Sequence, residues 1–151
     1  MKKKTPTKKS KLNSQFSVGV KNFTRIASAI LPKNYELSVV FADDKLTRSL
    51  NRKYRGKNKP ANVLSFPLSK NSGEIFLNSK RIKKDAPKFG LSQKNCTIYM
   101  FIHALLHLKG FEHSARMDAQ ERRFLKMFKI DLPESLKTHS QTNGKKNISR
   151  N

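Results

Sequence analysis

The segment from Ile98 to Leu108 is apolar almost all round a predicted helix, yet it contains His103 and His107, four residues apart. At this spacing both imidazoles project from one face of a helix, about one turn apart. A helix that is apolar all round is expected to be buried. Burying imidazole nitrogens is costly unless other groups satisfy them. The fold must therefore bury this helix and also give its histidine face a partner.

A third histidine follows in the same string, HALLHLKGFEH. Gly110 can end the helix in a left-handed conformation that only glycine adopts cheaply. The chain can then bring His113 back toward His103 and His107. Three converging imidazoles with one open position are typical of a catalytic zinc site, so we predict one Zn²⁺ per chain. Cys96 lies about two turns earlier and is a poor fourth ligand, and His139 lies in a polar segment where no role is expected.

The histidine spacing is similar to the extended zinc-protease signature, in which a glutamate after the first histidine is the general base. Here that position is Ala104, which cannot accept a proton. A peptidase is therefore disfavoured, and the absence of a C-x-x-C pair disfavours a zinc nucleobase deaminase. A metal-activated water can also attack a phosphodiester if the protein holds a polyanion.

The charge of the chain favours such a partner. It contains 33 Lys and Arg against 10 Asp and Glu, a formal net charge of +23. The densest stretch surrounds Tyr54, has no acid and indicates a phosphate-binding surface; its basic residues are Lys45, Arg48, Arg52, Lys53, Arg55, Lys57 and Lys59. Residues 1–12 and 137–151 are basic, acid-free and polar. We expect them to be disordered tails that serve solubility or a non-specific attraction to a polyanion, flanking one domain at 13–136.

The pattern along the chain predicts a single α/β (α+β) domain, with a mixed β-sheet and packed helices. Strands are expected at 35–42, 63–66 and 73–78, and helices at 20–31, 43–54, 79–88, 92–109 and after 113. We expect Leu46 and Leu50 to face inward, and Pro67 to stop the second strand. In the last helix the expected inner residues are Met117, Phe124, Leu125 and Phe128.

The remaining features concern the compartment. A single cysteine cannot form an internal disulfide and favours a reducing environment. The most apolar run is far shorter than the roughly 20 residues of a membrane helix. No apolar stretch follows the basic N-terminal residues, as a secretory signal would require. We therefore expect a cytoplasmic protein with no membrane association.

Two long motifs and a strand resemble the YbeY family of bacterial rRNA maturation endoribonucleases. Residues 50–67, LNRKYRGKNKPANVLSFP, are similar to its LNxxYRGKxxPTxVLSFP segment. The string HALLHLKGFEH resembles its HGxLHLxGYDH metal motif, and GEIFLN resembles its GDI strand. The resemblance covers about residues 35–130. The departures are Ala104 for Gly, Ala61 for Thr, Phe111-Glu112 for Tyr-Asp and Glu74 for Asp, and none removes a ligand.

The resemblance implies that His103, His107 and His113 bind zinc and that Arg55 takes part in catalysis or RNA binding. We add Arg52, Lys53, Lys57 and Lys59 as candidate RNA contacts, and Glu112 as a candidate general base or orienting acid. Glu112 is equally consistent with an ordinary surface acid in a turn.

The implied activity is a zinc-dependent, single-strand-specific endoribonuclease that matures the 3′ end of 16S rRNA and acts in ribosome quality control. Its partners would be single-stranded RNA, rRNA and the small ribosomal subunit. The alternatives are a ribosome-associated RNA-binding factor with a structural metal, and a zinc hydrolase of another substrate class. The sequence does not indicate an oligomeric state.

Overall fold

The computed structural model describes residues 19–137. Its helices are α2 (Val20–Ile30), α3 (Asp44–Arg55), α4 (Ser79–Asp85), α5 (Gln93–Leu108), α6 (Ala115–Met127) and α7 (Glu134–Lys137), with a 3₁₀ turn at Ala86–Phe89. Its strands are β1 (Glu36–Phe41), β2 (Val63–Ser69) and β3 (Ser72–Leu77). The expected mixed α+β domain is confirmed. The expected tail at 1–12, residues 13–18, His139 and all of the 137–151 tail beyond Lys137 lie outside the described residues.

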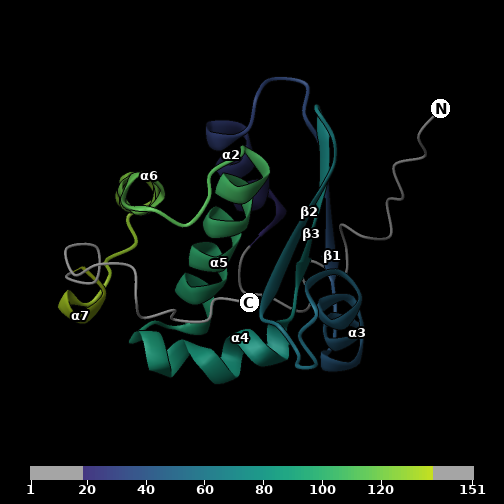
Figure 1. Cartoon of the computed structure of the whole chain (residues 1–151). Coiled ribbons are helices and arrows are strands. Elements are labelled where there is room, and N and C mark those ends of the chain that lie inside the picture. Colours follow the sequence, from purple (N-terminus) through teal and green to yellow (C-terminus); the bar gives the residue numbers. More distant parts are fainter. Residues whose placement is uncertain (1–18, 138–151) are drawn as a thin grey trace.

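The three strands form one mixed sheet in the order β1-β3-β2, in which β3 runs parallel to β1 and antiparallel to β2. Side chains alternate along β3, so Ile75 and Leu77 are completely buried while Phe76 points to the other face. Figure 1 shows α5 along one side of the sheet and α3 on the opposite side. The sheet therefore has a core face that carries α5 and an outer face toward α3.

Helix α5 is the centre of the core, as its sequence predicts. Ser92 caps its N-terminus by accepting a hydrogen bond from the Asn95 amide. Every side chain from Cys96 to Leu106 is buried, and the ring of Phe101 meets that of Phe23 of α2 edge-on, with 4.7 Å between the ring centres. Within residues 19–137, none of the helices combines the length and the apolar character that crossing a membrane requires.

The prediction that the second strand stops at Pro67 is wrong. β2 continues to Ser69, with Pro67 opposite Gly73 and an irregularity between Pro67 and Ser69. Proline lacks an amide proton, but β2 is an edge strand of the described sheet, where one side of the strand needs no hydrogen-bonding partner. The edge position explains why the prediction of a strand end was wrong.

The inner face of α3 also differs from expectation. Leu46 is 39% exposed and Leu50 is only half-buried, whereas Thr47 and Asn51 are completely buried. Thr47 Oγ1 accepts a hydrogen bond from the Ala61 amide, and Asn51 Nδ2 donates one to the Lys59 carbonyl. The hydrophobic pattern was misleading because the face of α3 that carries Thr47 and Asn51 contacts the backbone of the following loop rather than apolar side chains. The prediction that Leu46 faces inward was wrong. The basic segment that follows α3 is held in place by the buried polar side chains of Thr47 and Asn51.

Candidate metal centre

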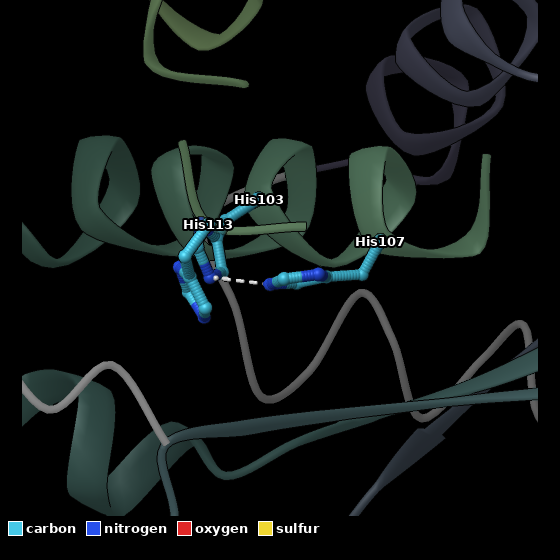
Figure 2. Close-up of side chains that lie close together, drawn as sticks. All are labelled: His103, His107 and His113. Atoms are coloured by element: carbon cyan, nitrogen blue, oxygen red, sulfur yellow. Dashed lines mark hydrogen bonds between the residues drawn. The ribbon is translucent and has the colours of Figure 1, made fainter. Parts of the chain in front are cut away.

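The three histidines of the HALLHLKGFEH string converge in the structure. His103 and His107 project from α5, and Gly110, at φ +105°, allows the chain to reverse after the helix. The Phe111 amide then bonds back to the Leu106 carbonyl at 3.0 Å, and His113 returns to the other two. Figure 2 shows the three imidazoles gathered together beside α5. One ligand nitrogen from each of His103, His107 and His113 lies within 4.8 Å of the others.

The hydrogen bonds at the far side of two rings assign their tautomers. His103 Nδ1 lies 2.8 Å from Glu121 Oε2, and His107 Nδ1 lies 2.9 Å from the Phe111 carbonyl oxygen. A carboxylate and a carbonyl can only accept, so each Nδ1 carries the proton and donates. The two Nε2 atoms face each other at 3.1 Å, where one can donate a hydrogen bond to the other when it carries a proton.

Two nitrogen lone pairs at this distance repel each other unless a proton or a cation lies between them. Tetrahedral zinc with bonds of about 2.0–2.1 Å places its nitrogen ligands about 3.3 Å apart. The 3.1 Å between His103 Nε2 and His107 Nε2 is close to that separation. The residues therefore fit a metal ion bound by three imidazoles.

The electrostatic environment keeps His107 ready to bind a cation. Its burial lowers its pKa to about 4; the neighbouring His103 and His113 and the charge of Arg55 act in the same direction, against the hydrogen bond to Phe111. His107 is therefore neutral at physiological pH, with a lone pair on Nε2. The same observation places Arg55 within electrostatic reach of the centre.

Arg55 is the last residue of α3, and Gly56 ends the helix in the left-handed region at φ +66°. Desolvation lowers the pKa of the Arg55 guanidinium from its ordinary value. An arginine nevertheless stays charged at any physiological pH. The permanent charge of Arg55 acts on His107, and the placement of Arg55 and the histidines in one site remains a prediction.

Glu121 is the residue of the centre that the sequence did not reveal. It lies on α6, is only 3% exposed, and accepts the hydrogen bond of His103. A buried carboxylate is costly unless it is paired. A cation on the other nitrogen of His103 would compensate its charge through the ring, an arrangement common in metal sites. The available signal was the spacing of Met117, Glu121 and Phe124, which puts the acid on the apolar face of α6.

Arg55, His113 and the remaining candidate residues lie at the surface. Arg52, Lys53, Lys57 and Lys59 are exposed around the end of α3. Glu112 is exposed next to His113, and its carbonyl accepts a hydrogen bond from Ser114 Oγ. These positions are compatible with the roles predicted for them, which remain predictions.

The chain is similar to known proteins over most of its length. The family model of Endoribonuclease YbeY matches residues 2–130. Two curated relatives bear the same name. One, from Anaplasma phagocytophilum, is 44% identical over 64% of this chain and 64% of its own length. The other, from Methylocella silvestris, is 35% identical over 71% of this chain and 67% of its own length.

A third protein of that name, from Chelativorans sp., is 35% identical over 60% of this chain and 61% of its own length. The chain thus spans about three fifths of the length of the first relatives it matches. The solution structure of TM1509 from Thermotoga maritima shares the fold, with a TM-score of 0.53 at 20% identity over 95% of this chain and 94% of that one. The family match and the convergent histidines lead to one conclusion: this chain belongs to the YbeY family.

Proposed function

We propose that this protein is a zinc-dependent endoribonuclease that cuts single-stranded rRNA. In this proposal it acts in the cytoplasm on the small ribosomal subunit, matures the 3′ end of 16S rRNA and takes part in ribosome quality control. The name Endoribonuclease YbeY, carried by the family model and the curated relatives, supports the activity. The observation that carries it is the convergence of His103, His107 and His113, whose ligand nitrogens lie within 4.8 Å of one another, with the charge of Arg55 acting on His107.

His103, His107 and His113 are the residues that would hold the metal. When bound, zinc supplies a Lewis acid and lowers the pKa of a coordinated water to about 7. Glu121 and the Phe111 carbonyl keep the two helix-borne rings in orientation through their Nδ1 protons. These hydrogen bonds fix the rings before a substrate arrives, so little reorganisation accompanies the reaction.

Arg55 is the proposed phosphate-binding group. Its guanidinium carries paired donors that match phosphate oxygens. Its charge contributes to the low pKa of His107, which supports a phosphate-binding role on the side of the histidines. There the guanidinium would neutralise the charge that develops on the phosphate oxygens during cleavage.

Glu112 is the proposed proton acceptor for the attacking water. It lies in the turn between His107 and His113 and is exposed, so a proton can pass from it to solvent. Glu121 is unsuited to this step, because it is buried and its carboxylate already accepts from His103. The position of the zinc-protease base is occupied by the buried Ala104, which supports RNA rather than a peptide as the substrate.

The decisive experiment compares wild type with His107→Ala for bound zinc and for cleavage of precursor rRNA. We expect the variant to lose zinc and cleavage while circular dichroism shows a folded protein. Full cleavage by folded, zinc-free His107→Ala would contradict the metal mechanism. A wild type that binds rRNA equally well with and without zinc, and never cuts it, would instead support the binding-factor alternative.

A further inference from the structure

Tyr54 is the most exposed of the Phe and Tyr side chains in residues 19–137, at 58% of its surface. It lies in the last turn of α3, immediately before Arg55. Its ring packs on Phe66 of β2 with 5.2 Å between the ring centres, and Phe66 meets Phe76 of β3 at 5.8 Å. One side of an exposed aromatic ring is thus supported by the fold.

The support comes from the outer face of the sheet. Phe76 points away from the core, since its neighbours Ile75 and Leu77 are completely buried on the α5 side. Phe66 and Phe76 are both only partly buried. Because the helix end and two paired strands hold the three rings, Tyr54 would lose little conformational freedom when a ligand stacks on it.

The charges around this ring indicate which ligand it suits. Lys53 Nζ lies over the Tyr54 ring, 5.2 Å from its centre, and Arg52 and Arg55 are close to Tyr54 in the chain. No acid occurs from Lys45 to Lys59. A platform for an apolar protein segment does not need this surplus of cations. An aromatic face bordered by cations matches a nucleotide, whose base stacks while its phosphates are neutralised.

We propose that Tyr54 is a stacking platform for an unpaired base of the RNA strand, next to the nucleotide whose phosphate lies at Arg55. The inference rests on the proposed function and extends it, because it identifies the contact that favours single strands. A base inside a duplex has both faces covered by its neighbours and cannot stack on Tyr54. The RNA would pass the edge strand β2 between the outer face of the sheet and the histidines.

Fluorescence anisotropy with a short labelled oligoadenylate tests the proposal, with a gel to check that the RNA stays intact. We expect Tyr54→Ala to weaken binding by about 5- to 100-fold, which corresponds to the loss of one stacked base. Tyr54→Phe keeps the ring and should bind like wild type. Met127→Ala removes another exposed apolar side chain, 47% exposed on α6, and should change nothing.

A second readout reports stacking directly. The chain has no Trp and three Tyr, and of these Tyr99 is buried and Tyr35 half-buried. Stacking on Tyr54 should therefore quench the tyrosine fluorescence of wild type when oligoadenylate is added. In Tyr54→Phe the quenching should disappear while the affinity stays. Duplex RNA of equal length should show no dependence on Tyr54.

The possible outcomes separate this proposal from the one on which it rests. If Tyr54→Ala binds as tightly as a wild type that binds and cuts RNA, the platform is refuted and the endoribonuclease stands. If wild type neither binds nor cuts single-stranded RNA, the proposed function fails and the platform with it. If Tyr54→Ala does not fold, the affinity of wild type for an abasic oligonucleotide is compared with its affinity for the normal strand. Equal affinity for the abasic and the normal strand would overturn the proposal.

Discussion

The histidine centre and the basic end of α3 lie within electrostatic reach of each other but are built in opposite ways. At the centre, His103 and Glu121 are buried, and each helix-borne imidazole is fixed by an acceptor behind it. At the end of α3, Arg52, Lys53, Lys57 and Lys59 are exposed. At the histidine centre the fold fixes the positions of the side chains, whereas the end of α3 contributes mainly positive charge.

This difference has consequences for mutation. A buried group with a single acceptor is sensitive to the loss of that partner, because the remaining group stays unpaired. Exposed cations act through a screened field to which each contributes a small share. Changes at the centre should therefore affect metal binding and chemistry, and changes at the end of α3 should affect RNA affinity. Arg55 connects the two regions and provides the sharpest test.

Among the variants outside the three histidines, Arg55→Ala is expected to have the largest effect. Removing the proposed phosphate-binding guanidinium should lower the cleavage rate by about 100-fold, in the range seen for the loss of one preorganised donor. Bound zinc, measured by elemental analysis, should stay at the wild-type level because Arg55 is not a ligand. Arg55→Lys keeps the charge but not the paired donors, so its rate should be intermediate.

An unchanged cleavage rate in Arg55→Ala would remove this residue from the mechanism. A loss of both zinc and activity would show that the two regions form one structural unit, and would contradict the assignment of metal binding to the histidine centre alone.

Glu121→Ala is expected to weaken zinc binding by about 10- to 100-fold, the usual cost of removing the partner behind a metal-bound histidine. Glu121→Gln keeps an acceptor without the charge and should lose less. Competition with a chelating dye measures the affinity independently of cleavage. Glu112→Gln, which alters an exposed acid in the ligand turn, should bind zinc like wild type. Equal losses in the Glu112 and Glu121 variants would contradict the positioning role of Glu121.

Gly73→Ala tests how closely the sheet approaches α5. A Cβ at this position would lie 2.5 Å from Tyr35 Oη and 2.8 Å from Leu108 Cδ2, next to His107 in the chain. Both atoms end side chains that can shift, so we expect a loss of about 1 to 2 kcal/mol in the free energy of unfolding. Urea denaturation measures it. Gly19→Ala is the matched control, because a Cβ there meets nothing within 4 Å; a few tenths of a kcal/mol are expected.

The histidines could be predicted because their pattern is local. His103 and His107 share one helix face, and Gly110 indicates a turn after the helix that can bring His113 back toward them. Glu121 could not be assigned, because its bond to His103 joins two helices and depends on how α6 packs on α5. In the sequence, Glu121 differs from other helical acids only in its position on the same helix face as Met117 and Phe124.

The errors in the fold prediction have a similar cause. Leu46 was expected inside because leucine is apolar, but the neighbours of this face are the backbone groups of Lys59 and Ala61, which Asn51 and Thr47 satisfy. Pro67 was expected to end β2, but it lies at a sheet edge, which is set by the strand order. In both cases the deciding neighbour is distant in sequence, so local patterns carry no information about it.

The combined change of Lys57 and Lys59 to Gln is expected to have the smallest effect. Both side chains are exposed at the end of α3, so each would neutralise at most one phosphate. We expect about three- to tenfold weaker binding of single-stranded RNA at low salt, with a smaller difference at high salt. The slope of log affinity against log salt should fall by about 1.4, or about 0.7 for each phosphate contact with a single strand. Anisotropy titrations over a range of salt concentrations measure both quantities.

The matched control changes Arg122 and Lys126 of α6 to Gln, which removes the same charge from an exposed helix face. Figure 1 shows α6 on the far side of α5 from the sheet and α3. If RNA binds across the end of α3, this control should keep nearly the wild-type slope. Equal reductions from the two pairs would mean that affinity comes from the net charge of the whole surface. Zinc content should not change in either variant, because none of these four residues is a proposed metal ligand.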